Sequence, residues 1–229
     1  MKEFILVNKK EEAENITSLF LEPTDGAKYE YIPGQYVKIK PTNLTRGKSY
    51  TISSVPGDKF VRITIKRKGE VSSALVGMSV GEKILIDGPY GRFYPNTNLK
   101  NIVMLAGGVG ITPFMGMIKD KITSNFDGDI LLFYSNKTVK QTPFFDELNN
   151  LSKENPIFKI VHCLTEEKTA YPFIKEYSRI DENIIKKYVN KLEDRSFYIC
   201  GSVGFTDDMW KLLKGAGITE ENIFTETFY

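Results

Sequence analysis

Three glycines end an apolar stretch of the chain, at a point where a ligand could approach the backbone closely. Residues 101–105 are mostly apolar, residues 107–110 read Gly-Gly-Val-Gly, and a helix-compatible stretch follows Pro113. This order is typical of a buried parallel strand that turns into a helix N-terminus, where backbone N–H groups and the helix dipole favour a pyrophosphate. The third glycine of the dinucleotide fingerprint is missing, because Thr112 and Pro113 stand in its place. The run therefore predicts a dinucleotide site without identifying its kind.

Cysteine and histidine, the usual ligands of iron–sulfur clusters and zinc, are scarce in this chain. There are two cysteines, Cys163 and Cys200, and one histidine, His162. Two cysteines cannot supply the four thiolates of an iron–sulfur cluster, and the set does not resemble a zinc site. His162 lies in an apolar stretch, so we expect it to be structural, and no motif supports a Ser-His-Asp triad.

The composition is that of a globular protein. The chain has 229 residues, 41% hydrophobic and 26% charged, enough for one large domain or two compact ones. No apolar run reaches membrane-spanning length and the N-terminus has no signal-peptide pattern, so we expect a cytoplasmic protein without membrane insertion. The net charge of +2 is too small to indicate a nucleic-acid partner.

Basic residues concentrate in one segment, residues 38–68, which we call the basic stripe. It holds nine lysines and arginines and a single acid, Asp58. Such a stripe could hold cofactor phosphates or steer an acidic protein partner. A solvated sheet face would give the same pattern.

The two halves of the chain show different patterns. Short β-rich segments punctuated by turn residues predict an antiparallel β-barrel with strands at residues 4–7, 16–21, 36–39, 49–53, 61–66 and 83–86, and a short helix at 71–76 capped by Ser72. The second half alternates strands at 102–105, 130–134, 159–164, 196–200 and 222–226 with helices near 113–124, 144–151, 182–188 and 205–214. This predicts an α/β domain with a parallel five-stranded sheet. We place the domains at residues 1–97 and 98–229.

The segment Lys48-Ser49-Tyr50-Thr51-Ile52-Ser53-Ser54 gives a second chemical signal. A flavin needs a wall against its ring, donors near the ring atoms and cations for its phosphates, although an ordinary Ser/Thr-rich strand would look the same. The segment resembles the Arg-x-Tyr-Ser-x-x-Ser motif of the ferredoxin–NADP(H) reductase family of flavoproteins, with Tyr50, Thr51 and Ser54 in the tyrosine and serine positions. Lys48 stands where the family has arginine, so it would meet a phosphate without bidentate geometry, and Arg46 could share that contact.

Further segments match the family in chain order. Residues 31–37 resemble the barrel segment before the flavin motif, and residues 88–93 resemble the Gly-Pro-x-Gly-x-Phe at the end of the barrel. Residues 65–66 and 69–75 resemble the part that touches the flavin ring and then its phosphates. The resemblance thus implies a bound flavin, with FAD favoured and FMN the less favoured alternative. Its contacts would come from Lys48, Ser49, Tyr50, Thr51, Ile65, Lys66, Gly69, Val71 and Ser72.

In the second half, residues 107–113 match the family's pyridine-nucleotide loop, and residues 197–201 resemble its late strand ending in Cys-Gly. The resemblance implies nucleotide contacts from Gly108, Val109, Gly110, Thr112, Cys200 and Gly201, with Cys200 beside the nicotinamide. Ser202 and Phe205 depart from the proline and methionine found in many members. Without the resemblance, Cys200 would be interpreted as a small buried hydrophobe.

The end of the chain also fits the family. Glu226 and Phe228 match an acid two positions before an aromatic ring that covers the flavin, and Tyr229 could compete for that role. Such a ring must move aside before the nicotinamide can stack, so the resemblance implies a gate. An apolar terminus that docks a last strand is the plainer alternative.

The choice of coenzyme is open. Residues 134–137 follow the second strand of the α/β domain, where the adenosine ribose is expected. Lys137, helped by Ser135, would contact a 2′-phosphate and favour NADPH, and no acid at this strand end is available for the ribose hydroxyls of NADH. Lys137 could equally be a solvated loop charge.

The resemblance implies a flavin-dependent NAD(P)H oxidoreductase in which hydride passes between the nicotinamide and flavin N5. Thr51, Cys200, Glu226 and Phe228 would be its catalytic residues. Single electrons would then pass to or from a separate acceptor, either an acidic carrier such as ferredoxin or flavodoxin at the basic stripe or a small molecule. Two alternatives remain open: a non-catalytic flavin- or nucleotide-binding subunit or sensor, and a flavin-free NAD(P)-dependent dehydrogenase.

Overall fold

The computed structural model describes residues 1–42, 44–95 and 100–228. The described residues divide into two compact units, one within the ranges Met1–Tyr94 and Thr112–Asp120 and the other within Pro95–Ile111 and Lys121–Tyr229. The expected boundary between residues 97 and 98 lies outside the described residues, as does Tyr229. Among the described residues, no helix combines the length and the apolar character needed to cross a membrane.

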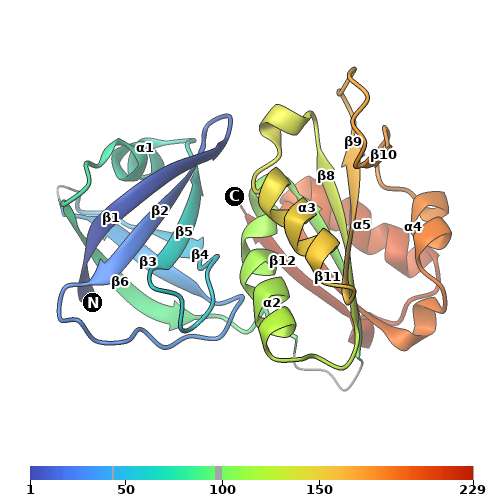
Figure 1. Cartoon of the computed structure of the whole chain (residues 1–229), viewed down its shortest axis with the longest axis horizontal. Helices are drawn as coiled ribbons and strands as arrows, with labels where there is room; N and C mark the ends of the chain where they lie inside the picture. Colours follow the sequence, from blue (N-terminus) through green and yellow to red (C-terminus); the bar gives the residue numbers. More distant parts are fainter. Residues whose placement is uncertain (43, 96–99, 229) are drawn as a thin grey trace. The chain divides into compact units, whose positions relative to one another are not determined.

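The first unit is built on a six-stranded antiparallel sheet (Figure 1), which confirms the predicted strands. The strands are β1 (Lys2–Ala13), β2 (Ile16–Pro23), β3 (Tyr36–Pro41), β4 (Lys48–Thr51), β5 (Val61–Lys66) and β6 (Lys83–Tyr90), in the order β4-β3-β6-β1-β2-β5. The sheet curls into a half-barrel, and a bridge between Ile52 and Ile63 joins its two edges. This bridge fixes the flavin-motif segment beside β5.

Alternating apolar residues fill the half-barrel. Phe4 and Leu6 of β1 and Leu19 and Leu21 of β2 are fully buried in one cluster, as period-2 patterning requires. Helix α1 (Glu70–Gly77) packs Val71 and Leu75 into the same cluster.

The prediction that Ser72 is the N-cap of α1 is wrong. Gly69 is the N-cap, and Ser72 lies three residues into the helix. The Ser72 hydroxyl nevertheless accepts hydrogen bonds from the backbone N–H groups of Lys68 and Gly69, both at 2.9 Å. Ser72 therefore holds the chain at the entrance of the helix from inside rather than from the cap position.

The second unit is a parallel α/β sheet, as predicted, but it has six strands instead of five. They are β7 (Asn101–Gly107), β8 (Asp129–Asn136), β9 (Phe158–Leu164), β10 (Ile174–Glu176), β11 (Arg195–Ser202) and β12 (Ile223–Phe228), in the order β10-β9-β8-β7-β11-β12. The missed strand, β10, is only three residues long, too short to show a periodic pattern.

The strand order creates a switch point at the centre of this sheet. From β7 the chain adds β8, β9 and β10 on one side and then returns to add β11 and β12 on the other. In open α/β sheets, ligands bind at the carboxyl ends of the strands where the order reverses. The carboxyl ends of β7 and β11 meet this condition.

Four helices follow the strands at the predicted places: α2 (Thr112–Thr123), α3 (Phe145–Glu154), α4 (Glu182–Tyr188) and α5 (Val203–Gly215). Helix α3 contacts β9 on one face of the sheet, and α5 lies on the opposite face (Figure 1). Apolar residues of α4 and α5 share one buried cluster with the strands. The side chains of Asp181 and Ser202 accept hydrogen bonds from backbone N–H groups in the first turns of α4 and α5, so polar caps fix where both helices begin.

Candidate functional site: a flavin half-site and a nucleotide half-site

The glycine loop after β7 is shaped by close contacts that exclude side chains. Gly108 has a φ of 55°, a left-handed conformation that favours glycine. A Cβ atom on Gly110 would collide with the carbonyl oxygen of Cys200, and one on Gly201 would lie 2.6 Å from the Phe205 ring. The loop and the end of β11 therefore approach each other closely at the switch point.

Phe205 explains one departure from the family pattern. A Cβ atom on Gly107 would lie 2.9 Å from this ring, so Phe205 covers glycines of both strand ends. Ser202, the other departure, accepts a hydrogen bond from the N–H of Phe205 at 3.3 Å and begins α5. Both residues thus have structural roles in this chain.

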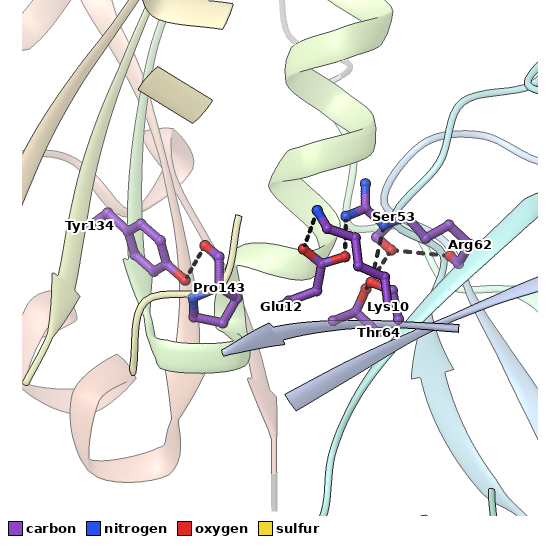
Figure 2. A network of polar contacts seen from close by, with 8 residues as sticks. Lys10, Glu12, Ser53, Arg62, Thr64, Tyr134 and Pro143 are labelled. Carbon is purple, nitrogen blue, oxygen red and sulfur yellow. Dashed lines mark hydrogen bonds and ion pairs between the residues drawn. The ribbon is translucent and has the colours of Figure 1, made fainter. Parts of the chain in front are cut away.

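A buried tyrosine whose role the sequence pattern does not reveal holds the glycine loop in place. The Tyr134 hydroxyl, near the end of β8, donates to the carbonyl of Gly108 at 3.0 Å. It also lies 3.3 Å from the carbonyl of Pro143 (Figure 2). Burial raises the pKa of Tyr134 well above its usual value, so the hydroxyl remains a donor. Its position in an apolar strand hid this role, because a tyrosine there also fits simple core packing.

Cys200 and Glu226 lie side by side on β11 and β12, on the opposite side of β7 from Tyr134. They are direct partners in the parallel register of β11 and β12. Two residues further along both strands, Ser202 is paired with Phe228. Cys200 is fully buried, and burial, followed by the Glu226 charge, raises the pKa of its thiol well above the usual value. Cys200 is therefore a neutral thiol that shapes its surroundings rather than a thiolate.

Glu226 is a largely buried carboxyl group whose pKa is shifted toward neutral pH. Burial raises its pKa to about 7. Its Oε2 atom is buried and has no hydrogen-bond partner among the described residues. A carboxyl group in this condition can hold or release a proton near neutral pH.

In the first unit, β4 carries two buried hydroxyl groups without partners. Thr51 is 3% exposed, and neither its Oγ1 atom nor the Tyr50 hydroxyl has a hydrogen-bond partner among the described residues. Burial raises the pKa of Tyr50 to about 12. Because buried hydroxyls are normally paired, these two atoms fit a polar ligand lying on β4, as a flavin would.

The remaining predicted flavin contacts divide into side chains that are available and side chains that are not. Lys48, Ser49, Lys66 and Gly69 are exposed. The side chains of Ile65 and Val71 are buried in the barrel core, so only their backbone groups could meet a ligand. The Ser72 hydroxyl is committed to the backbone, and that of Ser54 bonds the Tyr31 hydroxyl at 2.8 Å.

A buried polar network supports the flavin-motif segment. Arg62 of β5 contacts the carboxylate of Glu12 at 2.7 Å, and the side chain of Glu12 is 1% exposed. The Ser53 hydroxyl, within the motif segment, contacts Thr64 at 3.0 Å and donates to the Arg62 carbonyl at 3.1 Å (Figure 2). Arg62 is thus a buried member of the basic stripe, and it anchors the segment rather than presenting a charge to solvent.

The surroundings of the single histidine are those of a buried core residue. His162 is fully buried, burial lowers its pKa to about 4, and its Nε2 atom lies 3.2 Å from the Asn149 side chain. The described residues hold no group of three or more His, Cys, Asp or Glu side chains placed to share a metal ion.

Two features are typical of flavoproteins that use a pyridine nucleotide: a half-barrel with buried hydroxyls that have no partner in the described part of the chain, and a parallel sheet with a glycine loop at its switch point. Residues 3–94 match the oxidoreductase FAD-binding domain, and residues 104–211 match the oxidoreductase NAD-binding domain. The chain belongs to the ferredoxin–NADP(H) reductase family of flavoprotein oxidoreductases. The two matched domain families bind FAD and a pyridine nucleotide, in agreement with the expected FAD and NAD(P)H.

Individual relatives agree with this assignment. Flavohemoprotein A of Dictyostelium discoideum is 32% identical over 99% of the chain and 60% of the relative. A flavohemoglobin of Malassezia yamatoensis with bound FAD and heme has a TM-score of 0.86 at 25% identity, covering all of the chain and 60% of that protein. The FAD/NAD-binding domain of a Vibrio cholerae nitric oxide dioxygenase has the same fold, with a TM-score of 0.86 at 23% identity, covering 99% and 98%. The chain spans about 60% of the length of the curated relatives it matches.

Proposed function

We propose that this protein takes hydride from NADH or NADPH onto its FAD and passes electrons singly to an acceptor. Two buried polar atoms carry this proposal, the Thr51 hydroxyl in the barrel unit and Glu226 Oε2 in the α/β unit, because neither has a hydrogen-bond partner within the residues that the structure describes. Bound FAD supplies the chemistry that connects two-electron and one-electron donors. The side chains of the protein have to bind the FAD and the nucleotide, orient their rings and supply or accept protons.

Residues 1–97 are assigned to FAD and residues 98–229 to the nucleotide. In this proposal Lys48 and Lys66 meet the FAD phosphates, Tyr50 lies against the ring and Thr51 donates near N5. Ser49 and Gly69 offer further polar groups, while Ile65, Val71 and Ser72 contribute through the backbone that they position.

On the nucleotide side, the loop of Gly108, Val109, Gly110 and Thr112 would receive the pyrophosphate. Neutral Cys200 and Gly201 shape the nicotinamide pocket, and Phe228 covers the flavin until the nucleotide arrives. Glu226 holds a proton below about pH 7 and releases it above, so it can adjust the charge beside the nicotinamide.

The electron acceptor has three candidates. Exposed lysines of the basic stripe support an acidic carrier such as ferredoxin or flavodoxin, because opposite charges speed encounter. The flavohemoprotein relatives favour a heme protein instead. A small acceptor would depend on neither surface charge nor a docking face.

Anaerobic titration tests the central claim. The purified protein should show oxidised-flavin bands near about 375 and about 450 nm, and NADH or NADPH should bleach them. A flavin that neither nucleotide bleaches would leave only a binding subunit or sensor, and a protein without these bands would leave a flavin-free dehydrogenase. Stopped-flow reoxidation by ferredoxin, flavodoxin and a heme protein then ranks the acceptors, and only an acidic carrier should slow steeply with added salt.

A pair of lysine variants tests the phosphate contact. Lys48 lies on β4 and Lys59 in the turn before β5, and both are exposed members of the basic stripe. Lys48→Ala should raise the Kd for FAD several-fold, while Lys59→Ala should leave it unchanged. Equal effects would indicate a general charge effect and contradict the assigned role of Lys48.

A further inference from the structure

An acid lies beside Lys137 at the place proposed for the adenosine ribose. Strands β8 and β9 are parallel, with Asn136 opposite Leu164, and their pairing continues past both strand ends. The N–H of Thr165 donates to the Asn136 carbonyl at 3.0 Å, and the N–H of Glu166 donates to the Lys137 carbonyl at 2.8 Å. This ladder brings residues distant in the sequence together at the carboxyl edge of the sheet.

The side chains of this pair also meet. Lys137 Nζ lies 2.9 Å from Glu166 Oε1, so the lysine charge is compensated. The neighbouring Glu167 is occupied, because its carboxylate accepts from the backbone N–H groups of Val139, Lys168 and Thr169. Glu166 is therefore the acid whose remaining lone pairs are open to a ligand.

We propose that the Lys137–Glu166 pair selects NADH over NADPH. This inference rests on the proposed nucleotide site and deepens it. The ribose 2′- and 3′-hydroxyls of NADH can donate to the Glu166 carboxylate, which Lys137 holds in place. A 2′-phosphate carries a charge of about −2 and would face the same carboxylate without an uncompensated cation at this pair.

The proposal reverses the direction favoured by the sequence alone. Lys137 by itself favours a 2′-phosphate, and no acid follows β8 in the sequence. The acid comes from the end of β9, about thirty residues later. Only the parallel register shows that the two charges meet.

Binding of two ligands that differ only in the 2′-phosphate tests the proposal without catalysis. Calorimetric titration of the FAD-loaded protein would use 5′-AMP and adenosine 2′,5′-bisphosphate. Wild type should bind 5′-AMP the more tightly. Glu166→Gln should shift the affinity ratio toward the bisphosphate at least about tenfold, because the lysine charge is then free, and adding Lys137→Gln should reverse that shift.

The matched control is Glu182→Gln, which removes the acid of the exposed Glu182–Lys186 pair on α4 and should leave the ratio unchanged. The kcat/KM ratio for NADH and NADPH should follow the binding ratio. A wild-type preference for the bisphosphate, an unchanged ratio in Glu166→Gln, or no binding of either ligand at millimolar concentration would overturn the proposal. Failure of the proposed function is seen separately, as a flavin that neither nucleotide bleaches.

Discussion

Glu226 makes the stability of this protein depend on pH in a direction that a single substitution can isolate. The pKa of its carboxyl is about 7 in the folded protein, raised by burial from an ordinary value of 4.5. A group whose pKa is higher in the folded state stabilises the fold fully below the unfolded value, and this contribution is lost as pH rises through the folded value. The stabilisation from Glu226 should therefore decline between about pH 4.5 and pH 7.

The size of this effect follows from the pKa gap. One pKa unit corresponds to about 1.4 kcal/mol, so the gap corresponds to about 3 kcal/mol for a fully two-state transition. Glu226→Gln removes the titration but keeps a similar shape. Relative to wild type, this variant should gain about 3 kcal/mol in its free energy of unfolding between pH 4.5 and pH 8.

The assay is urea unfolding of both proteins across that pH range, in the absence of pyridine nucleotide. Titrations of all other groups affect both proteins equally, so they cancel in the difference between the two free energies of unfolding. Glu193→Gln, at an exposed acid, is the control and should follow wild type. A variant-to-wild-type difference that stays constant from pH 4.5 to pH 8 would refute the reasoning that burial raises the pKa of Glu226.

Three other substitutions test the two half-sites. Gly110→Ala should abolish pyridine-nucleotide binding and lower stability by about 2 kcal/mol or more, because the new Cβ collides with the Cys200 carbonyl. The control, Gly204→Ala, meets no atom within 4 Å and should be harmless. Equal behaviour of the two variants in calorimetry would contradict the close approach. Tyr134→Phe should weaken nucleotide binding about fivefold by freeing the loop, and an unchanged Kd would remove Tyr134 from the site. Thr51→Val should slow flavin reduction by NADH in stopped flow without loss of stability, since its hydroxyl has no partner among the described residues; a normal rate would refute its role.

The strands and helices that carry the half-sites could be predicted because their patterns are local. Alternating residues in β1 and β2, and glycines directly after β7, specify a barrel strand and a loop without knowledge of distant residues. Strand β10 could not be predicted, because three residues carry no period and its pairing with β9 is decided by tertiary contact.

The parts of the candidate site that escaped prediction depend on contacts between distant residues. Tyr134 is a core residue by its pattern, and its bond to Gly108 appears only when β7 and β8 are placed side by side. The sequence of the basic stripe gives no sign that Arg62 is buried, because its partner Glu12 lies about fifty residues earlier in the chain. The pKa of Glu226 likewise depends on burial that its own sequence neighbourhood does not reveal.

The contact between Gly110 and Cys200 has a consequence for exchanging parts between relatives. Because the glycine loop and the end of β11 leave no room for a side chain, and because Phe205 covers glycines of both segments, the two strand ends form an interlocked pair. A chimera that grafts residues 107–110 from another reductase into this chain should keep its nucleotide site only if residues 200–205 are transferred with them. To change the coenzyme of this protein, residues 107–110 and 200–205, about ninety residues apart, would thus have to be exchanged together.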